Sequence, residues 1–160
     1  MSIDITAQVA IRRPRAEVAA YMIDPANDPT WIGCVLEVRM ETPPPLRTGS
    51  RMARIASFLG RRVEYVNEVT DLDPERVLDM RSVKAPFPMR VTYSFEDGDG
   101  AGATIVRNRV RGDPGGFFAL FGPLLAPLVK RSVQRDLERL RDVLEDQPGS
   151  APAASSPSPS

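Results

Sequence analysis

Few residues in this 160-residue chain could do acid–base or metal chemistry, because the sequence contains no histidine. Without an imidazole there is no ready general base, metal ligand or pH switch. The single cysteine, Cys34, can form neither an internal disulfide nor a thiolate metal site. The glycines at 98–102 read as a hairpin turn, not as a phosphate loop or dinucleotide motif. We therefore expect no metal and no cofactor.

In several segments every second residue is apolar, which is typical of the inner face of a half-buried sheet. The remaining polar candidates occupy these same inward positions. This inward polar set comprises Arg54, Tyr65, Asn67, Ser82, Tyr93, Thr104 and Asn108. A buried polar group without a partner costs ~1–3 kcal/mol, so each needs a hydrogen bond from protein, water or ligand. An apolar pocket with a few convergent polar groups is typical of a small-molecule site.

Each of these residues also has a purely structural interpretation, as a core aromatic, a backbone-bonded amide or a surface arginine. The placement of Arg54 depends on the hairpin around Gly60. A loop with an even number of residues, with Phe58 opposite Val63, turns Arg54 inward beside Asn67. An odd loop turns it toward water.

Large apolar residues complete the candidate ligand-binding set. They are Trp31, Met80, Phe95, Phe117, Phe121 and Leu125. We place Trp31 at the pocket entrance, where it either forms a lid or simply packs. The apolar stretch 115–129 is the core face of a helix, a pocket wall or a membrane-contact site. It is shorter than the ~20 residues of a transmembrane helix and contains two prolines.

The elements that must position these residues follow from the apolar periodicity. Strands are predicted at 3–11, 34–41, 51–59, 62–72, 77–84, 89–96 and 103–111. A helix is predicted at 15–23, a short segment at 26–32, and one long helix or a kinked pair at 114–145. Consecutive strands with segregated helices indicate an α+β fold with an antiparallel sheet.

Composition fits one domain at residues 1–147, followed by an uncharged tail at 148–160 that we expect to be disordered. Lysine plus arginine (21) equals aspartate plus glutamate (21), which argues against a nucleic-acid partner. The N-terminus lacks a basic start followed by an apolar core, so we expect no signal peptide and a cytoplasmic location.

Five local motifs, in this order, resemble the START-like superfamily, also called SRPBCC, which includes polyketide cyclases and lipid carriers. They are RPRAEV at 13–18, DP…W at 24–31, GRR…EVTDLDP at 60–74, YSFE…GAT at 93–104 and DLERL at 136–140. The resemblance implies a helix-grip fold. In that fold a curved antiparallel sheet of about seven strands wraps around a long C-terminal helix, with two short helices after the first strand.

The resemblance also implies a cavity between the sheet and the C-terminal helix. We expect this cavity to bind or transport a small hydrophobic molecule, lipid or polyketide-like. A cyclase or aromatase is the alternative, with Arg54 and the tyrosines polarising a carbonyl. The inward sheet face carries no aspartate or glutamate for acid–base work, which favours binding. A third alternative is a protein-interaction module at a membrane or ribosomal complex; the oligomeric state is not predicted.

Overall fold

Seven antiparallel strands form a single sheet in the computed structural model, which describes residues 2–100 and 102–147. The elements, with η for 3-10 helices, are β1 (Ile3–Ile11), α1 (Arg15–Ile23), η1 (Pro25–Asn27), α2 (Asp28–Trp31), β2 (Val35–Met40), β3 (Arg51–Phe58), β4 (Arg61–Asp73), β5 (Val77–Lys84), β6 (Met89–Asp97), β7 (Thr104–Gly112), η2 (Gly116–Leu124) and α3 (Leu125–Asp146). The strand order is β1-β7-β6-β5-β4-β3-β2. The predicted α+β helix-grip fold is confirmed, and each strand boundary lies within one residue of its prediction.

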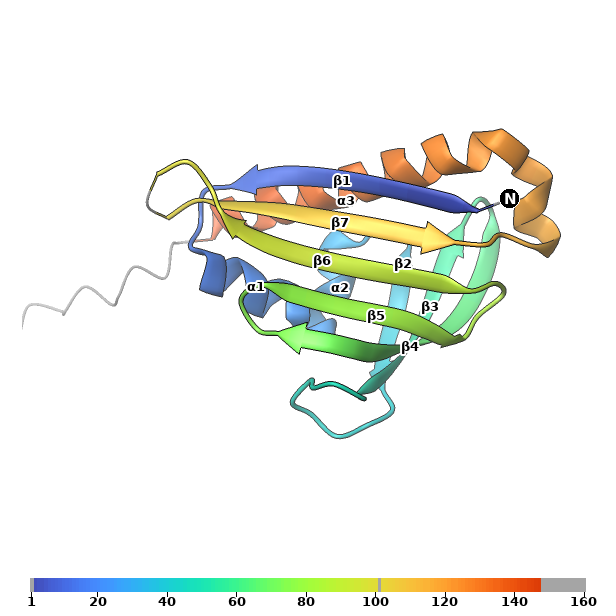
Figure 1. Ribbon diagram of the computed structural model, residues 1–160, viewed down its shortest axis with the longest axis horizontal. Coiled ribbons are helices and arrows are strands. Elements are labelled where there is room, and N and C mark those ends of the chain that lie inside the picture. Colours follow the sequence, from blue (N-terminus) through green and yellow to red (C-terminus); the bar gives the residue numbers. More distant parts are fainter. Residues whose placement is uncertain (1, 101, 148–160) are drawn as a thin grey trace, which may run out of the picture.

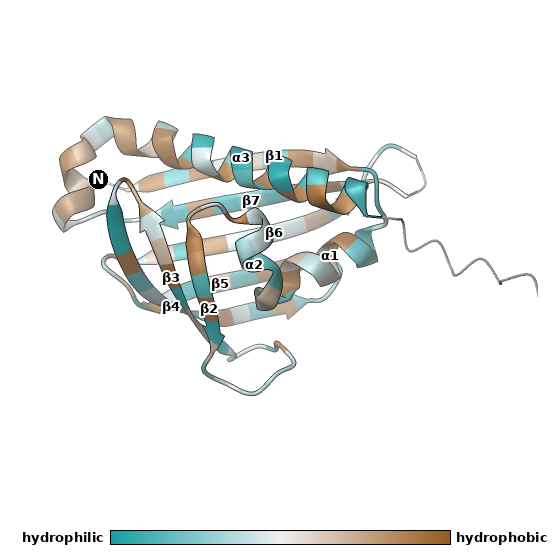
Figure 2. Cartoon of the chain, turned by 180° about the vertical axis from the view of Figure 1, so that it is seen from behind, coloured by the Kyte–Doolittle hydropathy of each residue, from teal (hydrophilic) through white to brown (hydrophobic). Residues whose placement is uncertain are grey.

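The sheet curves around α3, which runs along one face close to β1, while α1 and α2 cover the other end of the same face (Figure 1). Leu137, Leu140 and Leu144 are buried in this contact, at spacings that place them on one side of the helix. Seen from the helix side, apolar and polar residues alternate along the strands beneath (Figure 2). The predicted tail at 148–160 lies outside the described residues.

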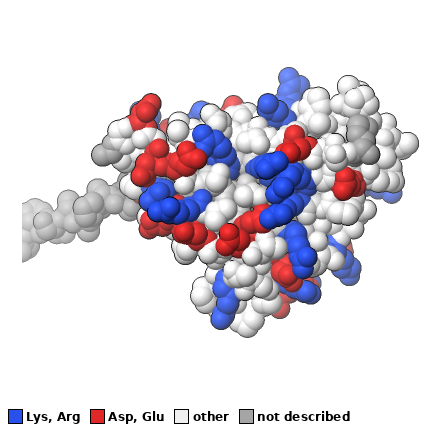
Figure 3. Space-filling view, viewed as in Figure 1, with Lys and Arg blue, Asp and Glu red and all other residues white. Residues whose placement is uncertain are grey.

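Charged residues cover the outer face of the sheet, where opposite signs are interspersed (Figure 3). Cross-strand ion pairs join them, such as Arg109 with Asp4 at 2.7 Å. Asp79 also points outward, yet it is buried, because Arg90 and the hydroxyls of Thr70 and Thr92 bond its carboxylate. The strand faces predicted from alternation are thus the observed ones.

The β3–β4 hairpin has a two-residue turn, Leu59-Gly60, so Arg54 lies on the inner face as the even loop requires. The predicted pairing is nevertheless wrong by two residues. Phe58 pairs with Arg61 and Arg54 pairs with Tyr65, not with Asn67. Leu59 and Gly60 have positive φ angles of 51° and 76°, as a two-residue hairpin turn requires. This turn is shorter than the loop that we predicted, so β4 begins its pairing two residues earlier.

The C-terminal part is a kinked pair, one of the two predicted arrangements. The helical backbone breaks at Gly122, which has a φ of 53°, and Pro123 follows it. By length and composition alone, the span Gly116–Asp146 is apolar enough to cross a membrane. In the fold, however, this span is bent at the kink, and α3 buries its leucines against the sheet.

Candidate ligand-binding cavity

A cavity of about 190 Å³ lies between the inner face of the sheet and the first half of α3. Inward side chains of β3 to β7 form its floor. Leu125, Val129, Val133 and Asp136, at helical spacings on one face of α3, form its roof. Most lining atoms are apolar, because both elements turn their hydrophobic faces toward each other.

Eight of the eleven predicted ligand-binding residues line this cavity. They are Trp31, Arg54, Tyr65, Asn67, Met80, Tyr93, Asn108 and Leu125. The sheet residues among them come together because strands that share a face in sequence share it in the fold.

Phe117 and Phe121 do not line the cavity, contrary to the prediction. Phe118 does, and it is buried against Phe58 and Phe87, with ring centroids 6.3 and 5.4 Å away. Phe117 and Phe121 are partly buried in the same apolar cluster, with their rings 5.5 Å apart, but neither reaches the cavity. Phe117 instead packs under the Arg61 guanidinium, 4.6 Å from the ring centroid.

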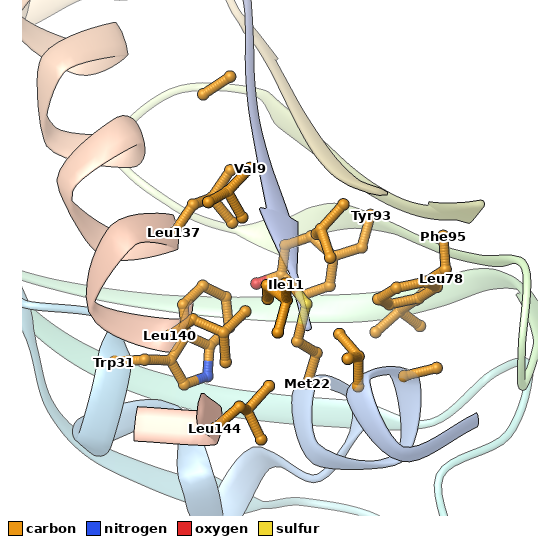
Figure 4. Packing of buried hydrophobic residues seen from close by; sticks show 14 of the residues in the cluster. Val9, Ile11, Met22, Trp31, Leu78, Tyr93, Phe95, Leu137, Leu140 and Leu144 are labelled. Atoms are coloured by element: carbon orange, nitrogen blue, oxygen red, sulfur yellow. The ribbon is translucent and has the colours of Figure 1, made fainter. Parts of the chain in front are cut away.

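Phe95 is buried on the inner face as predicted, but it does not line the cavity. It lies in the solid core at the α1 end of the sheet, beside Leu78 and near Met22 (Figure 4). Helix α1 covers that end of the sheet, so no space remains beside Phe95 for a ligand.

Trp31 lines the cavity but is buried in the core, which does not fit its predicted place at the entrance. It is fully buried, and its ring meets Tyr93 edge-on at 5.8 Å between centroids. Its indole Nε1 is buried without a hydrogen-bond partner among the described residues. Trp31 therefore brings both an apolar ring and an unsatisfied hydrogen-bond donor to the cavity lining.

Arg54 forms a buried ion pair with Asp28, a residue that the sequence did not single out. Arg54 Nε and Nη2 both donate to Asp28 Oδ2, at 2.7 and 2.6 Å. Burial by itself lowers the pKa of Arg54, but the neighbouring carboxylate outweighs it and holds that pKa above its ordinary value. Desolvation raises the pKa of Asp28, and Arg54 opposes that rise; the short, two-fold contact identifies the two groups as an ion pair. Asp28 lies on α2, outside the strand pattern that found Arg54.

Asp136 is the second carboxylate that the sequence reasoning missed, and it lines the cavity from α3. The backbone N–H of Gly33 donates to its Oδ1 at 3.0 Å, and Arg139 Nη1 lies 3.7 Å from the same atom. Desolvation raises the pKa of Asp136 to about 6 despite both contacts. A signal was available, because Asp136 follows Val133 by three residues and precedes Leu140 by four, on the apolar face of the helix.

Two atoms of cavity-lining residues, Trp31 Nε1 and Asn108 Oδ1, have no hydrogen-bond partner among the described residues. Asn108 Oδ1 is buried without a hydrogen bond, as judged within residues 2–100 and 102–147. Burial raises the pKa of Tyr65 to about 12 and raises that of Tyr93 further, so both hydroxyls are neutral at physiological pH. Burial likewise raises the pKa of Cys34 to about 11, which leaves an unreactive thiol.

A larger hollow of about 540 Å³ lies on the opposite face of β2 to β5. Exposed charged side chains line it, among them Glu37, Arg39 and Lys84. Its open, polar surface does not resemble an apolar ligand pocket. The inner cavity is therefore the candidate site.

Comparison with known proteins agrees with this geometry. Residues 2–145 match the family described as polyketide cyclase / dehydrase and lipid transport. Among curated proteins, no sequence matches this chain.

Solved structures share the fold at low sequence identity. Zhui aromatase/cyclase from Streptomyces sp. R1128 is 16% identical, with a TM-score of 0.77 over 94% of this chain and 98% of that one. The protein TTHA0849 from Thermus thermophilus is 19% identical, with a TM-score of 0.76 over 90% and 99%. A START superfamily protein from Mycobacterium smegmatis is 11% identical, with a TM-score of 0.74 over 89% and 97%.

Proposed function

This chain belongs to the polyketide cyclase / dehydrase and lipid transport family, and from that premise we propose that it binds a small hydrophobic molecule between the sheet and α3. One observation carries the proposal: an apolar cavity whose lining residues include buried polar atoms without a partner among the described residues. Such groups are costly unless a ligand or water completes their hydrogen bonds.

The cavity volume supports a compact ligand. An apolar cavity of ~150 Å³ accepts benzene, whereas drug-sized ligands occupy ~300–1,000 Å³. At about 190 Å³, this cavity suits a substituted aromatic ring better than a long-chain lipid.

The substitution Asn67→Leu tests the proposal, because Asn67 is buried in the cavity wall. We expect it to weaken binding of 4-ethylphenol at least tenfold by calorimetry, while the free energy of unfolding changes by about 1 kcal/mol or less. It should also remove any co-purified small molecule seen by native mass spectrometry of the wild type. Thr6→Leu, on the exposed face of β1, is the control and should leave binding unchanged. Unfolding of the Asn67 variant would instead make Asn67 structural.

A cyclase is the second candidate, supported by the likeness to Zhui aromatase/cyclase and by Arg54, Tyr65 and Tyr93 in the cavity. These groups could polarise a ligand carbonyl. The small volume and the pairing of Arg54 with Asp28 favour binding over this chemistry. Conversion of a linear poly-β-ketone to a ring by the wild type, lost in Arg54→Met, would reverse this order.

Contact with an anionic membrane, from a cytoplasmic location, is a further part of the proposal. Leu120 and Leu124 of η2 are 81% and 66% exposed, and Figure 3 shows that this end of the molecule is mostly uncharged. Phe118 in the same segment lines the cavity, and Arg61 and Lys130 supply nearby cations. Leu120→Ser should reduce co-sedimentation with phosphatidylserine vesicles severalfold, and unchanged sedimentation would contradict the contact.

A further inference from the structure

We propose that the cavity selects uncharged ligands that carry a hydrogen-bond donor, such as a primary amide or a phenol, over carboxylates of the same shape. The inference rests on the proposed function, because it concerns the ligand of the same cavity. Two features carry it: the neutralised charge of Arg54 and the unpaired acceptor of Asn108.

The positive charge of Arg54 is already neutralised by Asp28. Arg54 is 5% exposed, and two of its nitrogens donate to one oxygen of Asp28. A ligand carboxylate would therefore meet an ion pair without net charge, not a free guanidinium. Because a buried anion needs a counter-ion, the carboxylate would lose its hydration without compensation.

Asp136 makes the cavity still less favourable for an anion. Its carboxylate belongs to the lining, in which Arg54 and Asp136 are the charged residues within the described part of the chain. Asp28 stands directly behind Arg54, so these three groups sum to a negative charge whenever Asp136 is ionised. Arg139 offsets this only from the surface, where its side chain is half exposed and also donates to the Trp31 carbonyl.

Asn108 adds the requirement for a donor. It lies on β7 opposite Tyr93 of β6, and its Oδ1 is buried without a partner within the described residues. A primary amide or a phenol can donate to this oxygen, whereas a carboxylate has no proton to give at neutral pH. The unpaired Trp31 Nε1 could donate to the carbonyl of an amide as well as to a carboxylate, so the charges and the Asn108 acceptor decide between the two classes.

Three probes of one shape separate these effects: 4-ethylbenzamide, 4-ethylacetophenone and 4-ethylbenzoate, titrated by calorimetry at pH 7.5. We expect the amide to bind at least tenfold more tightly than the benzoate, with the ketone between them. Asn108→Leu should bring the amide to the affinity of the ketone. Equal or tighter binding of the benzoate to the wild type would overturn the inference while leaving the proposed function intact. If none of the three binds, the proposed function itself is contradicted.

The ion pair supplies a second test. Asp28→Asn frees the charge of Arg54, so the preference for amide over benzoate should fall at least tenfold. Because this variant leaves a buried cation unpaired and can unfold, the double variant Asp28→Asn/Arg54→Gln addresses the same point. It removes both charges and should keep the wild-type preference. Asp71→Asn, at an exposed position of β4, is the matched control. A preference that is unchanged in a folded Asp28→Asn would overturn the role of the pair.

Discussion

Asp136 is the residue whose ionisation the cavity controls most directly. Desolvation raises its pKa from 3.8 to about 6, so the folded state holds this proton more tightly than the unfolded chain. The stability that this provides is complete below about pH 4 and is lost as the pH rises through about 6.

Asp136→Asn should therefore raise the free energy of unfolding at pH 7.5 by on the order of 2 kcal/mol, an advantage that vanishes near pH 4. Thermal melts of both proteins across this pH range check the prediction. Asp142→Asn on the exposed side of α3 should show no such trend. A difference between Asp136→Asn and wild type that does not depend on pH would contradict the assignment.

At the level of single residues, the sequence predicted most accurately the side chains whose direction depends only on their position along a strand. Tyr65, Asn67 and Tyr93 face the cavity because every second residue of a strand shares a face. Asp28 and Asp136 could not be found this way, because they reach the site from helices docked onto the sheet. Their positions depend on how the helices pack against the sheet, and the alternation of residues along a strand gives no information about that packing.

Among the elements, the β3–β4 hairpin decides whether Arg54 faces the cavity or water. Gly60 closes it with a φ of 76°, and a Cβ at this position would meet no other atom within 4 Å. Gly60→Ala should therefore destabilise the protein through backbone strain alone, by about 1 kcal/mol. Gly115→Ala is the matched control, since Gly115 has equal space and an ordinary negative φ. Equal melting temperatures for the two variants would contradict the strain.

Element types and boundaries were predictable from periodicity, but two local geometries were not. The tightness of the Leu59-Gly60 turn shifted the hairpin pairing by two residues, because Leu59 is not a residue that usually adopts positive φ. In η2, a 3-10 helix that breaks at Gly122, Phe118 lines the cavity in place of Phe117 and Phe121. Both depend on backbone conformations that side-chain pattern does not report.

At the scale of the whole molecule, ligand binding requires a hollow at one end of the sheet, whereas the other end is a solid core. Ala56→Leu, in the cavity wall, should fill space, abolish binding of 4-ethylphenol and leave the melting temperature unchanged or higher. Ala19→Leu, in the packed core under α1, should instead cost ~1–3 kcal/mol. Equal destabilisation by both changes, measured by chemical unfolding, would mean that both ends are packed alike.

A crystal structure of the wild-type protein soaked with 4-ethylphenol tests the central claim most directly. We predict electron density for the phenol between the sheet and α3, with its hydroxyl within hydrogen-bond distance of Asn108 Oδ1 or Asn67. An interior filled by protein side chains, with the phenol absent or bound only at the surface, would contradict the claim that this fold encloses a ligand.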